Sequence, residues 1–190
     1  TADVKMDAEV SEVYPDLPEA NARIIDSLLY RHWDAWHDYS YSHLHIARLE
    51  GNRLFETRDL MSGMRVDCPL PPFGGAEQFA WSPDGRRIAV TVRGENDDIW
   101  IMDTQRGTQT CLTFGPGSDR SPTWSPDGTR IYFKDGDGAP TYELKMRAAD
   151  GTGETAGLGR GSAPKPSSDG RFLFYGFFDL ERSNWDVHAM

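Results

Sequence analysis

Trp81-Ser82-Pro83-Asp84-Gly85 occurs a second time in this chain, as Trp124-Ser125-Pro126-Asp127-Gly128. A reduced copy follows as Ser167-Ser168-Asp169-Gly170, and the Asp-Gly pairs of the three copies lie 43 and then 42 residues apart. In the full copies, Pro presets φ for the second position of a tight turn, and in all three Gly accepts the positive φ that closes it. We therefore expect three equivalent turns at a regular interval along the chain.

The residues that follow each turn are β-branched and aromatic, which is typical of strands. Three such runs, at 87–92, 130–133 and 171–175, predict the second strand of each repeat. Further strand-like runs follow before the next copy of the turn begins, so one repeat holds four short strands. A repeat of about this length is characteristic of propellers. The sequence predicts an all-β fold, a partial β-propeller of four-stranded, WD40-like blades with a short N-terminal helix.

The repeat also predicts how the chain is divided. We expect residues 1–32 to form an N-terminal extension and residues 33–190 to form the partial propeller. Its expected blades cover residues 33–72, 76–114 and 119–158, with an incomplete fourth blade at 161–190. Each blade buries its faces against its neighbours, so an incomplete array leaves apolar surface exposed. We expect the chain to be part of a longer protein or to await a partner segment.

The first seventy residues have no copy of the repeated turn. Apolar side chains recur at helical spacing between residues 22 and 33, which predicts a helix over about 19–32. Beyond it, Ser42–Leu49 is expected to be the third strand of the first blade, and Met64–Leu70 its fourth strand.

Composition excludes several classes of partner. The formal net charge is −10, whereas nucleic acids and anionic membrane surfaces attract basic patches. The chain also lacks an apolar stretch of about 18 residues, the length that a membrane-spanning helix needs. We therefore expect neither nucleic acid nor a membrane as a partner.

The two cysteines, Cys68 and Cys111, lie 43 residues apart, so they occupy equivalent outer-strand positions on adjacent blades. Neighbouring outer strands diverge, and a disulfide needs Cα atoms within about 7 Å of each other. Two free thiols are expected. Free cysteines do not distinguish between cellular compartments. A periplasmic or secreted location and a cytoplasmic one are both compatible with the sequence.

Two patterns suggest metal binding. His43 and His45 share one face of a strand, but no third ligand stands at a spacing typical of zinc sites. The run 135–138 resembles the start of a calcium loop, but Pro140 stands where that loop needs Gly and Met146 where it needs Glu. We expect no metal and no cofactor.

Catalytic motifs are absent from the sequence. It contains no Gly-x-Ser-x-Gly nucleophile motif, and its glycine-rich run at 151–161 lacks the Lys-Ser/Thr ending of a phosphate-binding loop. We expect no catalytic residue in this segment.

The loop Phe73–Gln78 is the most distinctive candidate for binding, because it joins the first blade to the inner strand of the second. Gly74 and Gly75 allow the backbone to approach another surface closely. Glu77 then places a carboxylate near the mouth of the central channel, where it could bind a cationic group. The alternative is a tight turn with a solvated glutamate.

Three segments together resemble the N-terminal propeller of prolyl oligopeptidase family serine peptidases, and in particular bacterial dipeptidyl-peptidase 5-like enzymes. These segments are Leu29–Trp36, Asp67–Leu70 and Phe73–Gly85. The Trp-Ser-Pro-Asp-Gly motif alone is shared with TolB-like propellers, and its combination with the other two segments is more specific. The last copy departs from the pattern, because Pro166-Ser167-Ser168 replaces Trp-Ser-Pro.

The resemblance implies a two-part enzyme in which the propeller caps an α/β-hydrolase domain with a Ser-Asp-His triad. That domain and the remaining blades would be supplied outside this chain. Such enzymes release dipeptides from peptide N-termini, and an acidic group of the non-catalytic domain commonly neutralises the substrate's amine. The resemblance makes Glu77 the candidate for this role, with Gly74 and Gly75 beside it. The expected function is to gate and position peptide substrates. The alternative is a non-catalytic, TolB-like propeller that serves as a protein-binding scaffold.

Overall fold

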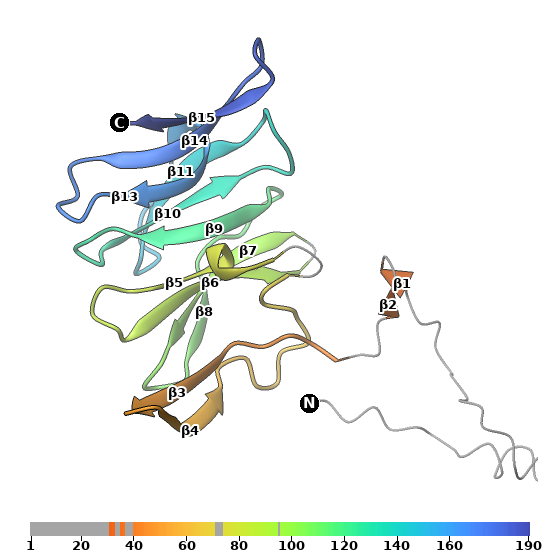
Figure 1. The fold of residues 1–190 in the computed structure, drawn as a ribbon, viewed down its shortest axis with the longest axis vertical. Coiled ribbons are helices and arrows are strands. Elements are labelled where there is room, and N and C mark those ends of the chain that lie inside the picture. Colours follow the sequence, from red (N-terminus) through yellow and green to blue (C-terminus); the bar gives the residue numbers. More distant parts are fainter. Residues whose placement is uncertain (1–30, 33–34, 37–39, 71–73, 95) are drawn as a thin grey trace, which may run out of the picture. The chain divides into compact units, whose positions relative to one another are not determined.

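The computed structural model describes residues 31–32, 35–36, 40–70, 74–94 and 96–190, which belong to two compact units, Thr1–Tyr41 and Ser42–Met190 (Figure 1). In the first unit, β1 (Arg31–His32) pairs antiparallel with β2 (Ala35–Trp36). The helix expected over 19–32 lies outside the described residues, apart from Arg31 and His32. Those two residues are in a strand, so the expected C-terminal end of the helix is wrong.

The second unit is a series of antiparallel sheets (Figure 1). A two-stranded sheet comes first, with β3 (His45–Glu50) and β4 (Arg53–Asp59). A four-stranded sheet follows, with β5 (Phe79–Trp81), β6 (Arg87–Arg93), β7 (Asp97–Asp103) and β8 (Gln109–Cys111). The next sheet contains β9 (Asp119–Trp124), β10 (Arg130–Asp135), β11 (Glu143–Ala148) and β12 (Ala156–Arg160). The last contains β13 (Ser162–Pro166), β14 (Leu173–Asp179) and β15 (Asn184–Ala189).

These sheets follow one another in sequence order, each packed on the next, as blades do. The expected all-β partial propeller with four-stranded blades is confirmed. The part of the chain that the structure describes has one short 3-10 turn, Ala76–Gln78, before β5. No helix there is long and apolar enough to cross a lipid bilayer.

The three repeated turns share one set of hydrogen bonds. In each, the serine hydroxyl donates to the aspartate two residues on, at 2.6, 2.6 and 2.5 Å for Ser82, Ser125 and Ser167. The same hydroxyl oxygen accepts the backbone N–H five residues on, at 2.9, 2.9 and 3.0 Å. The glycines have φ of 68°, 70° and 70°. The reduced third copy therefore forms the same turn, because it keeps Ser, Asp and Gly.

The first repeated turn and its strands are linked to the second copy in the next blade. Trp124 donates its Nε1–H to the backbone carbonyl of Ala80 at 2.9 Å, which joins the first strands of two blades. The Arg87 guanidinium lies 4.6 Å from the centre of the Trp124 ring and donates to the carbonyl of Gly128 at 3.1 Å. Trp124 and Arg87 thus hold the second and third blades together.

Strand β6 is buried on both faces because it lies in the interior of the series. Ile88, Val90 and Val92 belong to a cluster shared with β3–β4, which also contains Leu60, Met61, Cys68 and Met102. Ala89, on the other face, belongs to a second cluster shared with β9 and β10, which includes Trp124, Ile131 and Phe133. Alternate residues of one strand thereby serve two interfaces, which explains its nearly continuous apolar sequence.

The first blade differs from the expectation. In the first sheet His45 pairs with Asp59. Adding 43 residues to each gives Ile88 and Met102, which pair in the same way between β6 and β7. Strands β3 and β4 therefore correspond to the second and third strands of a blade. The residues after Ser42 are therefore not a third strand, and Met64–Leu70 is not a strand. A tight turn at Gly51, which has φ of 58°, joins β3 to β4, so the two strands form a hairpin.

Both cysteines are free thiols. Cys68 is fully buried, and burial, followed by the charge of Asp67, raises its pKa to about 12. Cys111 is partly buried and donates to the carbonyl of Thr113 at 2.9 Å.

The register gives the sheets two distinct ends. One end carries the loops between β6 and β7, between β10 and β11, and between β14 and β15, and we call it the loop end. The repeated turns and the β11–β12 connection lie at the other end, the turn end. The candidate site residues lie at the loop end.

Candidate functional site

The loop that precedes β5 is held by contacts within itself. The N–H of Gly74 donates to the carbonyl of Leu70 at 2.7 Å, and the N–H of Leu70 donates to Oε1 of Gln78 at 2.5 Å. A Cβ at position 74 would overlap the backbone of Leu70. Gly74 therefore permits a close approach of the loop to the backbone of Leu70.

Gly75 has a similar relation to Glu77. Its N–H donates to Oε1 of Glu77 at 2.9 Å, and a Cβ at position 75 would lie 2.8 Å from Oε2 of the same side chain. The Glu77 side chain is exposed, so its carboxylate is oriented by the loop while remaining open to solvent. The structure therefore presents a fixed, accessible anionic group at the start of the second blade.

The turn that carries Glu77 lies against β9 of the next blade. Lys134 lies on β10 of that blade, and burial lowers its pKa. The charge of Arg120 lowers the pKa further, whereas the charge of Glu77 raises it. The ammonium of Lys134 lies 4.2 Å from the centre of the Tyr142 ring. The charge of Glu77 thus acts on a lysine of the next blade, and that lysine lies over the ring of Tyr142.

Arg120 is already paired. It forms an ion pair with Asp97, whose side chain is 4% exposed, and its Nη2 atom lies 3.6 Å from Oδ1 of Asp137. Arg93 contacts the same Asp97 at 3.4 Å. This network joins the second and third blades and leaves Arg120 little capacity for a ligand.

A second group of carboxylates lies beside it. Burial, together with the charge of Asp135, raises the pKa of Asp119 to about 6. Asp135 pairs with Lys145, so the run 135–138 supplies a structural ion pair and a hairpin loop.

One of the two histidines considered as metal ligands, His43, has other contacts. Nδ1 of His43 lies 2.8 Å from Asp59, and its Nε2 lies 3.1 Å from the carbonyl oxygen of Met64. Within the described ranges, no three His, Cys, Asp or Glu side chains are grouped so that they could hold a metal ion.

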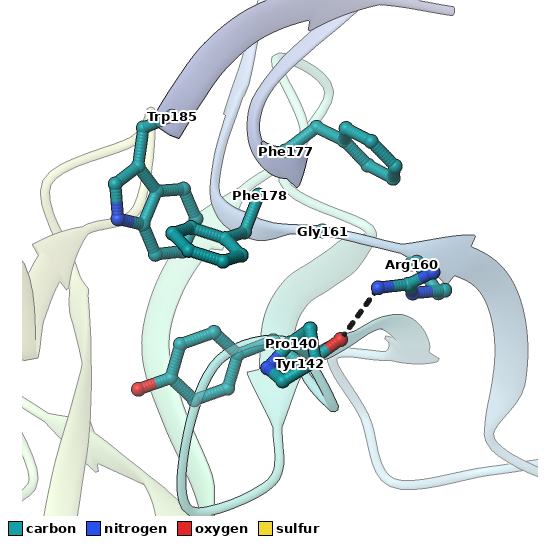
Figure 2. A pocket seen from close by; sticks show the side chains of 7 residues that line it. All are labelled: Pro140, Tyr142, Arg160, Gly161, Phe177, Phe178 and Trp185. Carbon is teal, nitrogen blue, oxygen red and sulfur yellow. Dashed lines mark hydrogen bonds between the residues drawn. The ribbon is translucent and has the colours of Figure 1, made fainter. Parts of the chain in front are cut away.

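A small cleft opens at the loop end between the third blade and the last sheet (Figure 2). Tyr142 stacks on Trp185 with ring centres 6.2 Å apart, and Phe178 meets Trp185 edge-on at 5.4 Å. Arg160 donates to the carbonyl of Pro140 at 3.0 Å on the facing side. We call this the aromatic cleft; its lining is Pro140, Tyr142, Arg160, Gly161, Phe177, Phe178 and Trp185.

Sequence reasoning missed the aromatic cleft. Tyr142 and Trp185 are far apart in the chain, and they meet only because adjacent hairpins bring their loop ends together. A signal was available in part, because both residues stand at the start of a third strand, one repeat apart.

Curated relatives include peptidases. The chain is 36% identical over 143 residues to dipeptidyl-peptidase 5 of Porphyromonas gingivalis, with 70% of this chain and 21% of that protein covered. It is 28% identical over 157 residues to dipeptidyl-peptidase 5 of Aspergillus fumigatus, with 68% of this chain and 22% of that protein covered. The chain therefore spans about a fifth of the length of these relatives.

Solved structures show the same fold. A TolB-type protein from Agrobacterium tumefaciens superposes with a TM-score of 0.54 at 23% identity, covering 70% of this chain and 48% of that one. TolB from Acinetobacter baumannii gives a TM-score of 0.52 at 18% identity, over 76% and 37% of the two chains. Residues 71–187 match the PD40 family, described as the TolB beta propeller domain. The repeated turns, the successive antiparallel sheets and this match together show that the chain belongs to the PD40 family of TolB β-propeller domains.

Proposed function

We propose that this chain is the N-terminal propeller segment of a serine exopeptidase similar to dipeptidyl-peptidase 5, and that it gates and positions peptides for an α/β-hydrolase domain. The identity of 36% to such a peptidase supports this, as does the chain's coverage of about a fifth of that protein's length. The remaining blades and the catalytic domain belong to the rest of the longer protein. The peptide substrate is the ligand of this segment.

The observation that carries the proposal is the exposed carboxylate of Glu77, oriented by the N–H of Gly75. An enzyme that removes two residues from a peptide end must measure distance from that end to its nucleophile. A fixed anion that binds the substrate's ammonium provides such a reference point, and holding the peptide there makes the reaction effectively intramolecular. Gly74 and Gly75 keep the loop in the conformation that presents Glu77.

Binding of blocked and free amines to this chain tests the role of Glu77. The dipeptide amide Ala-Phe-NH2 carries an ammonium, whereas its N-acetylated form is neutral and otherwise matched. A charge-assisted hydrogen bond contributes about 1.5–3 kcal/mol, so the free amine should bind roughly tenfold or more tightly by NMR titration.

The substitution Glu77→Gln should reduce the affinity for the free amine to that of the acetylated form. Glu154→Gln is the matched control, because Glu154 is also exposed and lies in the β11–β12 connection at the turn end. Equal affinity for the two dipeptides, or full retention of binding by Glu77→Gln, would exclude Glu77 as the amine anchor.

The coding sequence beyond Met190 tests the wider proposal. A peptidase requires further blades and then a Gly-x-Ser-x-Gly motif on a strand–turn–helix, the context of an α/β-hydrolase nucleophile. In that full-length enzyme, Glu77→Gln should raise KM for free-amine substrates. A short continuation that only closes the ring would instead support a non-catalytic, protein-binding propeller.

A further inference from the structure

We propose that the outer face of the last sheet binds a further blade of the same four-stranded repeat. The outer face is formed by Phe172, Phe174, Val187 and Ala189, and the first and second strands of the further blade cover it. The inference deepens the proposed function, on which it rests for the presence of further blades in the longer protein. It adds the surface that receives the next blade and a side chain that this blade must supply.

The register shows which way the outer face points. Phe174 and Val187 project from one face of the last sheet, because Val187 is the register partner of the residue two positions after Phe174. Tyr175 projects from the opposite face, and a Cβ added at Gly161 would lie 2.6 Å from the Tyr175 ring and 2.9 Å from Leu144 of β11. The opposite face is therefore turned towards the third blade, and the outer face is turned away from it.

The positions of the outer face are buried in the preceding sheets. Ile99, Leu144 and Val187 are equivalent, because their register partners lie 43 and then 42 residues apart, as the repeated turns do. Ile99 and Leu144 are 0% exposed, whereas Val187 is 80% exposed. Ala89, the equivalent of Phe174, is 0% exposed, and Phe174 is 46% exposed. The outer face thus repeats one side of an interface that is complete elsewhere in the chain.

The interior of the series shows what covers such a face. Ala89 and Ile99 share one apolar cluster with residues of β9 and β10, which are the first and second strands of the following blade. In the same way β13, the first strand of the last sheet, contacts β9, β10 and β11 of the blade before it. Since stacked repeats bury their faces against their neighbours, the partner that fits the outer face is the next blade of the series.

The outer face carries little charge, although the whole chain has a net charge of −10. In the last sheet, Lys165 is the register partner of Phe174 and lies on the outer face. Asp186 is the register partner of Phe177 and lies on the opposite face. Contiguous apolar surface of this kind marks a site of interaction.

Phe172 specifies one feature of the incoming blade. Phe172 and Arg87 each stand two residues after the glycine of their repeated turn, so they are equivalent. Arg87 lies 4.6 Å from the centre of the Trp124 ring in the following blade, whereas Phe172 is 47% exposed. An aromatic ring at the position of Trp124 in the further blade would pack on Phe172, and such pairs contribute beyond their buried area. The further blade should therefore carry an aromatic residue directly before its Ser-x-Asp-Gly turn.

Labelling with N-ethylmaleimide measures whether the outer face is covered, and mass spectrometry separates an introduced thiol from Cys68 and Cys111. In the 190-residue chain, Val187→Cys and Glu154→Cys should react at similar rates, because both positions are exposed. In the full-length protein, labelling of Val187→Cys should slow by about a hundredfold or more, because a thiol in a blade interface reacts only when the interface opens. Glu154→Cys is the control, since Glu154 lies in the β11–β12 connection at the turn end.

A second substitution tests the contact at Phe172. In the full-length Val187→Cys variant, Phe172→Ala should speed labelling by about tenfold, because it removes the ring on which the aromatic residue of the further blade packs. Phe114→Ala is the matched control and should leave the rate unchanged. Phe114 is 67% exposed and has Arg147 5.0 Å from the centre of its ring, but it follows β8 and lies outside the outer face.

Equal labelling of Val187→Cys in the two proteins would overturn the proposal, as would a coding sequence that contains no further blade. Protection that already appears in the 190-residue chain and increases with its concentration would show that a second copy covers the outer face, which also overturns it. An unchanged rate in Phe172→Ala would reject the aromatic contact. If the full-length variant does not fold, hydroxyl-radical oxidation of Phe174 in the wild-type protein gives the same comparison.

The labelling rate does not depend on catalysis, so this inference and the proposed function fail separately. Fast labelling of Val187→Cys in a full-length protein that cleaves dipeptides would reject the docking surface and keep the peptidase. Slow labelling in a full-length protein without peptidase activity would keep the docking surface and reject the peptidase.

Discussion

Identical residues of the repeat have different roles according to their position in the series. Trp124 is 5% exposed and bonds the carbonyl of Ala80 in the preceding blade, whereas Trp81 is 48% exposed. The motif is the same, so the difference arises from what each ring packs against. Trp124 therefore contributes to the interface between two blades through both its buried ring and its N–H hydrogen bond.

Trp124→Phe removes that hydrogen bond and part of the buried ring. We expect the free energy of unfolding to fall by about 1–2 kcal/mol, measured by urea denaturation. Trp81→Phe is the control and should change the free energy of unfolding by less than about 0.5 kcal/mol. Equal losses in the two variants would show that the interblade bond contributes nothing.

Asp119 makes stability depend on pH. Its pKa is about 6 in the folded chain, against 3.8 for the free side chain. Between those values the folded state binds more protons than the unfolded state, so this group's contribution to stability falls as pH rises from about 4 to 6. Above pH 6 the buried charge destabilises the fold.

We expect Asp119→Asn to stabilise the chain at pH 7 by on the order of 1 kcal/mol, allowing for solvent screening of a partly exposed carboxyl. The gain should disappear below about pH 4, where the wild-type side chain is protonated. Denaturant unfolding at pH 4 and pH 7 checks this. A stabilisation that is the same at both pH values would contradict the assignment.

At the scale of elements, the Ser-x-Asp-Gly turn is the most regular feature of the chain. Its hydrogen bonds join residues no more than five positions apart, so the turn forms in the same way in the full and reduced copies. The pKa of Asp127 falls to about 2 because the hydroxyl of Ser125 and the N–H and hydroxyl of Thr129 bond its charged form. The glycine completes the turn because its φ of 68–70° is unfavourable for other residues.

Gly85→Ala tests the backbone requirement on its own. Gly85 has φ of 68°, and a Cβ there would meet nothing within 4 Å, so any loss comes from the left-handed conformation and not from a clash. We expect a loss of about 1 kcal/mol in the free energy of unfolding. Gly115→Ala is the control, because Gly115 also has open space around it but no positive φ, and it should be unchanged or slightly stabilised.

At the scale of the whole molecule, the sheets from β3 to β15 form a linear series in which each sheet packs on its neighbours. The interior strands are buried on both faces, as Ala89 and Val90 of β6 show with 0% exposure. Strand β15 forms the edge of the last sheet, and its Val187 is 80% exposed. Local stability should therefore decrease from the interior of the series towards its edges.

Amide hydrogen exchange checks this gradient. We expect amides in the centre of β6 and β7 to exchange at least about a hundredfold more slowly than those of β15, because opening β6 exposes two apolar clusters. Uniform protection across all the sheets would show instead that the unit unfolds in a single cooperative step.

The sequence by itself determined the all-β architecture, the three repeated turns and the loop that carries Glu77. Those features depend on residues a few positions apart, where Pro, Asp and Gly restrict the backbone directly. Only the tertiary structure decided that Glu77 lies near Lys134, that Asp97 pairs with Arg120, and that β3 and β4 are second and third strands. The tertiary structure also brings Tyr142 and Trp185 together in the aromatic cleft. Contacts between residues one repeat apart depend on how two sheets pack, and a local sequence pattern does not specify that packing.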